Sequence, residues 1–247
     1  MNPEIVIFDL DGTLTVSKSP LDSEMAELLD KLLEHTQVAV ISGGSYFQFQ
    51  NQFLKYLNSP DDRLKRLYLL PTSGACFYRY DGGWEKVYAG ELTEEEKEKI
   101  KHAFSVALGK ISEPPAVVKG EQVEDRGTQI TFSALGQEAP IELKEKWDPD
   151  QKKRLEIKSI LDSLLPEFEV RIGGTTSVDV THRGIDKAYG IEQISHELGI
   201  SKDKMLFVGD ALFQGGNDEA ATRTGVKVAS VSGPEETKIV IKHLLGL

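Results

Sequence analysis

Short apolar runs recur along the chain, and segments with helical periodicity separate them. The runs at residues 5–8, 38–41 and 67–70 contain almost no polar position, which is typical of strands buried on both faces of a parallel sheet. Between the first two runs, Asp22 can cap a helix whose apolar positions fall on one face: Met25, Leu28, Leu29, Leu32 and Leu33. The order strand, helix, strand predicts the right-handed parallel crossovers of a doubly wound α/β core.

The pattern changes after a tight hairpin turn predicted at residues 81–83, Asp-Gly-Gly. The next segments predict the alternating helices and strands of a smaller α+β unit, at residues 91–108, 129–132, 150–165, 169–172 and 176–180. After residue 185 the parallel α/β pattern returns. We therefore predict a Rossmann-like core at residues 1–83 and 185–247, with an inserted α+β cap domain at residues 84–184.

Composition and charge narrow the classes of protein to which the chain can belong. Hydrophobic residues make up 39% and charged residues 28%, as in ordinary soluble globular proteins. The formal net charge of −11 argues against nucleic-acid partners and against anionic membranes, so a phosphate-handling site needs local positive charge. Cys76 is the only cysteine, and residues 1–4 start neither a leader pattern nor a membrane span. We expect a cytoplasmic protein.

Two aspartates follow the first predicted strand, in the sequence Asp9-Leu10-Asp11-Gly12-Thr13. Asp9 and Asp11 are two residues apart in an extended segment, so their side chains lie on the same side. One carboxylate can then attack phosphorus to form an aspartyl-phosphate, while the other protonates the leaving oxygen and later deprotonates the acceptor. The alternative is a turn whose carboxylates bind calcium or cap a helix.

Two further clusters can contact a phosphate. Ser42, Gly43 and Gly44 follow the second predicted strand, where a hydroxyl and unobstructed amides can surround phosphate oxygens. Lys187 lies near a helix start, and its charge can orient Asp9 and offset the charge of the transferring phosphoryl group. An ordinary strand-to-helix loop and a solvated lysine are the alternatives for these two clusters.

The last cluster supplies oxygen ligands. Asp210 follows another predicted strand, and Asn217 and Asp218 lie in the next loop. Mg²⁺ prefers one or two carboxylates together with substrate oxygens and water, so we expect it to bind Asp9, Asp210 and the backbone carbonyl of Asp11. Asn217 and Asp218 are expected to support the groups around the ion. Helix capping is the alternative for Asp218.

The four clusters together resemble the haloacid dehalogenase superfamily, whose four motifs occur in this order. The insert at residues 84–184 has the size of the α/β cap found in subfamily IIB of that superfamily. The resemblance implies a Rossmann-like core, an aspartyl-phosphate intermediate and a Mg²⁺ cofactor.

Within that branch, the chain resembles the eukaryotic-type phosphomannomutases. The patches that carry this likeness lie at residues 173–180, 184–187, 215–218 and 233–237. The resemblance implies that Arg126, Ser177 and Asp179 hold the sugar and the remote phosphate of the substrate. It also implies a homodimer formed through the caps. A salt bridge and hydrogen bonds internal to the cap are the alternative for these three residues.

Two arginines of that family's substrate clamp fall, by an ungapped count from Arg126, on Gln137 and Lys144. Arginine grips phosphate with a planar fork, whereas lysine is a point charge and glutamine carries none. A mutase must hold a bisphosphorylated sugar while the sugar turns around, so a weakened clamp favours water as the phosphoryl acceptor.

The function predicted from the sequence is therefore a phosphatase that acts on a small phosphorylated sugar or a related metabolite. Lys144 is counted among its substrate-binding residues despite the departure from arginine. A phosphohexomutase of the phosphomannomutase type is the alternative. A phosphate-binding or regulatory protein without turnover is the third hypothesis.

Overall fold

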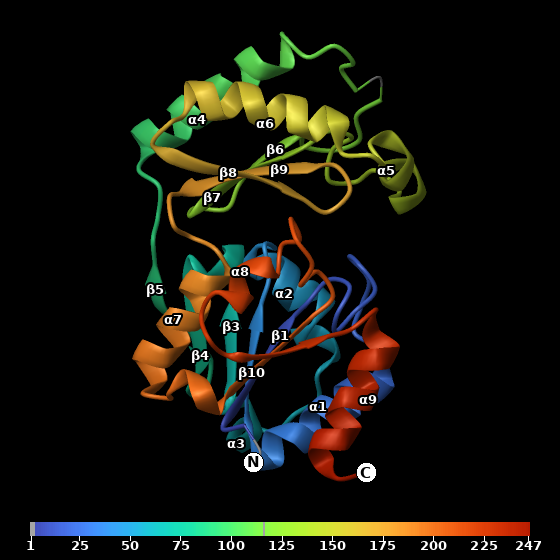
Figure 1. The fold of residues 1–247 in the computed structure, drawn as a ribbon, viewed down its shortest axis with the longest axis vertical. Coiled ribbons are helices and arrows are strands. Elements are labelled where there is room, and N and C mark those ends of the chain that lie inside the picture. The colour runs from blue at the N-terminus through green and yellow to red at the C-terminus, as the bar shows by residue number, and fades with distance from the viewer. Residues whose placement is uncertain (1–2, 116) are drawn as a thin grey trace. The chain divides into compact units, whose positions relative to one another are not determined.

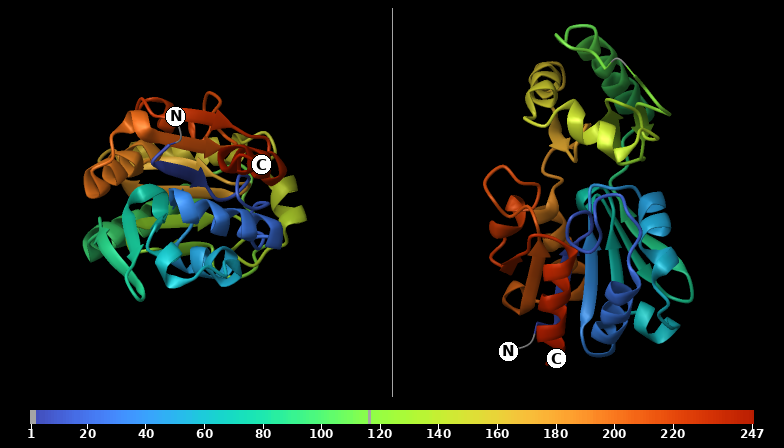
Figure 2. Two further views of the ribbon diagram at one scale, coloured as in Figure 1. Left: turned by 90° about the horizontal axis from the view of Figure 1, so that it is seen from below. Right: turned by 90° about the vertical axis from the view of Figure 1, so that its right-hand side faces the viewer.

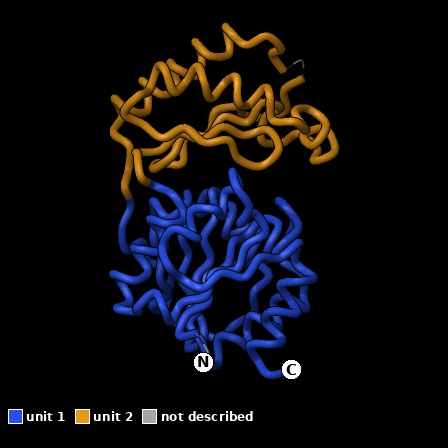
Figure 3. The backbone as a smooth tube through the Cα atoms, viewed as in Figure 1, with its two compact units in different colours: residues 1–89, 185–247 blue, residues 90–184 orange. Residues whose placement is uncertain are grey.

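The computed structural model describes residues 3–115 and 117–247, which form two compact units (Figure 3). The first unit combines Met1–Ala89 with Ile185–Leu247, and the second unit is Gly90–Gly184. Met1 and Asn2, part of the segment judged to have no leader pattern, lie outside the described residues. We call the second unit the inserted unit.

The first unit is built on one sheet, which in the described residues has seven strands in the order β11-β10-β1-β2-β3-β4-β5 (Figure 1). The strands are β1 (Ile5–Asp9), β2 (Gln37–Ile41), β3 (Leu67–Leu70), β4 (Cys76–Tyr80), β5 (Trp84–Ala89), β10 (Met205–Gly209) and β11 (Lys227–Ser230). The strands from β11 to β3 pair in parallel, and β4 and β5 add an antiparallel edge. The fold class is thus the doubly wound α/β core that the sequence predicted.

Helices cover both faces of this sheet (Figure 2). They are α1 (Ser23–His35), α2 (Tyr46–Gln52), α3 (Asp61–Leu64), α7 (Lys187–Leu198), α8 (Glu219–Thr222) and α9 (Pro234–Leu245), with short 3-10 turns at Leu54–Tyr56, Thr72–Gly74 and Lys202–Lys204. Val6 and Phe8 pack in one apolar cluster with α1 and α9, whereas Ile5 and Ile7 pack in another with α7. This alternation explains why β1 has no polar position before Asp9.

The inserted unit has an antiparallel sheet in the order β6-β7-β9-β8. Its elements are α4 (Glu94–Leu108), β6 (Val123–Asp125), β7 (Gln129–Ser133), α5 (Ile141–Trp147), α6 (Lys152–Leu164), β8 (Phe168–Gly173) and β9 (Ser177–His182). Phe104 of α4 and Leu161 of α6 pack against Phe132 and Val178 on one face of this sheet. The alternate strand positions, such as Thr131 and Asp179, are polar and form the other face.

The boundary between the units differs from the predicted one. Strand β5 pairs with β4 in the first sheet, because the turn at Asp81, which donates to the Gly83 carbonyl, folds the strand back onto its neighbour. Residues 84–89 therefore belong to the first unit, whereas the sequence pattern assigned them to the cap.

No helix in the described ranges is long and apolar enough to cross a membrane.

Candidate active site

Four of the predicted site segments meet at the carboxyl edge of the first sheet. Asp9 ends β1 and pairs in register with Ile41, the last residue of β2, so Ser42 follows beside it. On the other side of β1, Phe8 pairs with Val208 of β10, and Asp210 follows two residues later. Parallel strands bring their carboxyl ends to one edge, so the sheet itself assembles these side chains.

Lys187 connects Asp9 to Asp218 inside the protein. Its Nζ lies 2.6 Å from Asp9 Oδ1 and also donates to Asp218 Oδ1. The side chains of Lys187 and Asp9 are each 2% exposed, and the Asp218 side chain is 0% exposed. Lys187 is the first residue of α7, where the helix dipole disfavours a cation, so the two carboxylates provide the compensating charge.

Burial and charge shift the protonation of this cluster. Burial raises the pKa of Asp9 to about 7, although Lys187 acts in the opposite direction and Asp218 adds to the rise. Burial disfavours the charged form of Lys187, but Asp9 and Asp218 outweigh it and raise the Lys187 pKa above its ordinary value. Burial followed by the Asp218 charge raises the pKa of Asp210 as well. Excess negative charge therefore gathers around one cation.

The carboxylates of Asp9, Asp210 and Asp218 form an acidic cluster in which one oxygen of each lies within 4.8 Å of the others. Asp9 Oδ2 is buried and has no hydrogen-bond partner among the residues that the structure describes. Gly12 leaves room for Asp210, because a Cβ at Gly12 would lie 2.6 Å from Asp210 Oδ2. An all-oxygen donor set with an orphaned buried oxygen suits a hard divalent cation.

The cluster differs in membership from the predicted ligand set. Asp218 was expected only to support the ion, but its carboxylate lies within the acidic cluster. The backbone amide of Ala211 donates to Asp218 Oδ2 at 3.0 Å, and a Cβ at Gly209 would lie 2.4 Å from that oxygen. Asn217 is exposed.

The Asp11 carboxylate binds to helix α2 instead of the acidic cluster. Asp11 Oδ1 accepts from the Lys18 backbone amide at 2.6 Å and from Gln52 Nε2 at 2.9 Å, and Oδ2 accepts from Gln48 Nε2 at 2.9 Å. Sequence reasoning missed both glutamines. The sequence did contain one signal for them. Gln48 and Gln52 are four residues apart after Ser42-Gly-Gly, a spacing that places two side chains on the same face of a helix.

Ser42 and its glycines form the loop between β2 and α2. Ser42 is buried, and its hydroxyl accepts from the Gly44 backbone amide at 3.2 Å. The Ser45 side chain caps α2 by accepting from the Gln48 amide at 3.4 Å. The loop thus places a hydroxyl beside the end of β1 and starts the helix that carries the two glutamines. Gly43 lies between these anchored positions.

The predicted substrate residues of the inserted unit form a second polar cluster. Glu124 Oε2 accepts from Arg126 Nε at 2.9 Å, from Arg126 Nη2 at 2.7 Å and from Gln137 Nε2 at 3.1 Å. Lys144 is 2% exposed and donates to the Gln137 carbonyl at 2.8 Å. Sequence reasoning missed Glu124, whose carboxylate occupies the fork of Arg126.

Strand register connects this cluster to Asp179. Glu124 pairs with Thr131 and Thr131 pairs with Asp179, so the three side chains form a row on one face of the sheet. The Thr131 hydroxyl donates to Asp179 Oδ1 at 2.8 Å. Ser177, two residues before Asp179, lies on the same face and is half-buried. The structure therefore places Ser177 and Asp179 on one polar sheet face with Glu124, the partner of Arg126, whereas Lys144 lies on α5.

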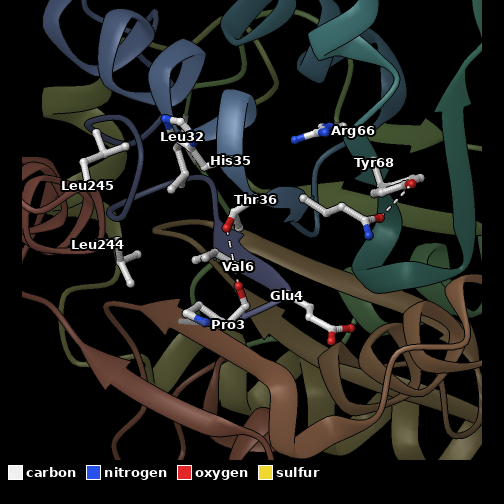
Figure 4. Close-up of a pocket in the computed structure, with 11 residues that line it drawn as sticks. Pro3, Glu4, Val6, Leu32, His35, Thr36, Arg66, Tyr68, Leu244 and Leu245 are labelled. Carbon is white, nitrogen blue, oxygen red and sulfur yellow. Dashed lines mark hydrogen bonds between the residues drawn. The ribbon is translucent and has the colours of Figure 1, made fainter. Parts of the chain in front are cut away.

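None of the site residues described above lines the pocket drawn in Figure 4. It has a volume of about 730 Å³, and Glu4, Thr36 and Arg66 from the starts of β1, β2 and β3 contribute to its lining. The starts of parallel strands form the edge opposite the one that carries Asp9. The pocket does not belong to the candidate active site, because the chemically competent side chains converge at the other edge.

Comparisons with known proteins identify relatives along most of the chain. A family model described as eukaryotic phosphomannomutase matches residues 25–247, a range that starts after Asp9 and Asp11. A phosphomannomutase from Spinacia oleracea is 30% identical over 241 residues, covering 94% of this chain and 92% of the relative. A phosphomannomutase from Schizosaccharomyces pombe is 26% identical, and the match covers 98% of this chain and 95% of the relative.

Solved structures with the same fold are more distant in sequence. An IMP-bound, truncated IMP-nucleotidase from Plasmodium falciparum has a TM-score of 0.71 at 18% identity, covering 100% of this chain and 69% of that chain. A haloacid dehalogenase-like hydrolase from Bacteroides thetaiotaomicron has a TM-score of 0.67 at 15% identity. The match covers 98% of this chain and 100% of the hydrolase chain. These two support the fold, and the sequence relatives favour the mutase alternative over the phosphatase prediction.

Proposed function

The chain belongs to the eukaryotic phosphomannomutase family, and from this premise we propose that it is a Mg²⁺-dependent phosphohexomutase acting on mannose phosphates. The observation that carries the chemistry is the buried Asp9 carboxylate. One of its oxygens is held by Lys187, and the other has no hydrogen-bond partner in the described part of the chain. An oriented carboxylate with one unsatisfied oxygen is suited to nucleophilic attack.

The proposed reaction has two halves at Asp9. A carboxylate oxygen of Asp9 forms a bond to phosphorus as the bond from phosphorus to the sugar oxygen breaks, and Asp11 gives that oxygen a proton. In the second half, Asp11 takes the proton from the acceptor hydroxyl, which attacks phosphorus and frees Asp9. Lys187 keeps Asp9 oriented through both halves and places positive charge beside the phosphoryl group.

We propose that Asp9, Asp210 and Asp218 hold Mg²⁺ through their carboxylates. The ion would supply positive charge that offsets the negative charge of the phosphate. The chain has a formal net charge of −11, so without such a cation the site would repel its substrate.

The polar row of the inserted unit is proposed to hold the sugar and its non-reacting phosphate. The residues proposed to do so are Ser177 and Asp179 on that sheet face, Arg126 bound to Glu124, and Lys144 of α5. Arg126 offers a planar guanidinium and Asp179 an acceptor for sugar hydroxyls. This assignment carries over from the family residue by residue. It is supported by the hydrogen bonds that join Arg126 and Gln137 to Glu124, and Lys144 to Gln137, in one cluster.

Glu124 favours a second candidate function, phosphatase activity. Its carboxylate accepts two hydrogen bonds from Arg126, so a phosphate must compete with it for the guanidinium. Gln137, which also donates to Glu124, carries no charge. A sugar monophosphate held this weakly would leave before its free hydroxyl attacked the phosphoryl group on Asp9, and water would then accept that group and free Asp9.

Phosphorus NMR on purified protein separates the two functions. The protein is supplied with Mg²⁺, mannose 1-phosphate and a catalytic amount of the 1,6-bisphosphate, which phosphorylates Asp9. We expect mannose 6-phosphate to accumulate in excess over inorganic phosphate. Release of inorganic phosphate in step with substrate loss would instead establish the phosphatase. Asp9→Asn should abolish both products, and turnover by this variant would contradict the role of Asp9.

A further inference from the structure

Helix α2 directs two side-chain amides at the carboxylate proposed as the acid and base. Gln48 Nε2 donates to Asp11 Oδ2 and Gln52 Nε2 donates to Asp11 Oδ1, both at 2.9 Å. Gln52 is buried and Gln48 is partly buried, so these bonds are shielded from water. A carboxylate beside solvent needs no such partners for its own stability, because water can satisfy its oxygens.

The orientation of both amides is determined by their other partners. Gln48 Nε2 also donates to Gln52 Oε1 at 2.8 Å, and Gln52 Nε2 also donates to Thr15 Oγ1 at 2.7 Å. The Thr15 hydroxyl directs its own proton to the Leu10 carbonyl at 3.3 Å, so it can only accept from Gln52. Turning either amide around would point a carbonyl oxygen at the Asp11 carboxylate. The Nε2 atoms of both glutamines therefore point toward Asp11.

The backbone of the loop before α2 makes room for this network. A Cβ at Gly44 would lie 2.4 Å from Gln48 Oε1, so only glycine allows the Gln48 amide its position. The turn after β1 supplies the third donor, the Lys18 amide, which lies 2.6 Å from Asp11 Oδ1. Two loops that are distant in sequence thus hold the same carboxylate.

Within residues 3–115 and 117–247, these three donors leave one acceptor position on the carboxylate. Two carboxylate oxygens together offer about four lone-pair sites. Oδ1 uses two of them, for Lys18 and Gln52, while Oδ2 uses only one, for Gln48. The remaining site, where a proton can sit, is on Asp11 Oδ2.

We infer that Gln48 and Gln52 are positioning residues that fix the rotation of the Asp11 carboxylate and assign the transferred proton to Oδ2. This inference rests on the proposed function, in which Asp11 is the acid and base. In the first half-reaction the proton leaves Oδ2 for the sugar oxygen as that oxygen separates from phosphorus. In the second half-reaction Oδ2 takes a proton from the acceptor hydroxyl. The glutamines act through Asp11 and contact no reacting atom.

The leaving group provides a test, because a sugar oxygen needs a proton to depart and p-nitrophenolate does not. We compare kcat/KM for mannose 1-phosphate and for p-nitrophenyl phosphate in Gln48→Met, Gln52→Met and the double variant. Methionine keeps the length of glutamine but donates no hydrogen bond. Gln50→Met is the matched control, because Gln50 lies on the same helix with its side chain exposed.

We expect the double variant to lose roughly 10- to 100-fold in kcat/KM for mannose 1-phosphate, a part of the full effect of a general acid. The loss for p-nitrophenyl phosphate should stay within about threefold, and Gln50→Met should match the unmodified protein for both esters. A merely structural role would lower both values by the same factor. An equal loss for the two esters, or no loss at all, would overturn the inference.

The inference and the proposed function fail differently in this experiment. If the unmodified protein transfers no phosphoryl group from either ester, or if Asp11→Asn keeps its mannose 1-phosphate turnover, the proposed function is wrong. If Asp11→Asn shows the selective loss and the glutamine variants do not, only the inference is wrong. Should Gln52→Met fold poorly, Gln48→Met still decides the question, because its side chain is only partly buried.

Discussion

Lys187 balances two buried carboxylates, and this arrangement makes it structurally as well as chemically important. Its Nζ contacts Asp9 and Asp218, and all three side chains are almost fully buried. Lys187→Met would leave two carboxylates buried without their cation. We expect unfolding free energy to fall by about 3–5 kcal/mol at neutral pH, as measured by urea titration.

The control for this change is Lys227→Met, because Lys227 is exposed on the edge strand β11. It should change the unfolding free energy by no more than about 0.5 kcal/mol. Equal stability of the Lys187→Met and Lys227→Met variants would show that the buried cation contributes nothing to the fold.

The raised pKa of Asp9 predicts a pH-dependent affinity for Mg²⁺. In the ion-free folded protein this pKa is about 7, against an ordinary value of 3.8, so the fold binds the proton more tightly than the unfolded chain does. Ion-free stability should therefore fall as pH rises from 3.8 to about 7. Below pH 7 Mg²⁺ must displace this proton. The affinity of the site for Mg²⁺ should therefore drop about tenfold for each unit by which the pH falls.

Thermal unfolding with and without Mg²⁺ at pH 6 and pH 8 measures this effect. We expect subsaturating Mg²⁺ to raise the melting temperature more at pH 8 than at pH 6. The Asp9→Asn variant cannot bind this proton, so Mg²⁺ should change its melting temperature by nearly the same amount at pH 6 and at pH 8. A larger Mg²⁺ shift at pH 6 than at pH 8 in the unmodified protein would contradict the role of Asp9.

At the scale of elements, burial determined what the sequence could predict. The strands β1, β2, β3 and β10 are apolar apart from Asp9 at the end of β1 and Gln37 at the start of β2, because helices cover both of their faces. Helix α1 shows a complete apolar stripe. Helix α2 was missed because only Phe49 and Gln52 of its seven residues are buried, too few for a helical period. Strand β6 has three residues, none of them buried, so no alternation identifies it.

The start of α2 allows a prediction about the element as a whole. Gly44→Ala would put a Cβ 2.4 Å from Gln48 Oε1, with no backbone strain involved, and should displace the Gln48 amide from Asp11. We expect kcat/KM for mannose 1-phosphate to fall roughly tenfold, with a smaller loss for p-nitrophenyl phosphate. Gly83→Ala is the control, because a Cβ at Gly83 meets no atom within 4 Å. If the two variants have the same activity, α2 tolerates the added Cβ.

At the scale of the whole molecule, the grouping of residues at the carboxyl edge of the first sheet was easier to predict than the grouping in the inserted unit. Asp9, Asp210 and Lys187 could be grouped because parallel strands bring their carboxyl ends to one edge. The inserted unit has no such rule, since its polar face depends on strand register. The pairing of Glu124 with Thr131 and of Thr131 with Asp179 could not be deduced from sequence spacing.

The choice of phosphoryl acceptor should respond to Glu124. Its carboxylate accepts two hydrogen bonds from Arg126, so Glu124→Gln removes a negative charge that competes with phosphate for the guanidinium. We expect the ratio of mannose 6-phosphate to inorganic phosphate, measured by phosphorus NMR, to rise severalfold, together with a lower KM for the bisphosphate. Glu121→Gln is the matched control, because Glu121 is exposed in the same unit. A ratio that falls, or that changes equally in both variants, would mean that Arg126 does not grip the non-reacting phosphate.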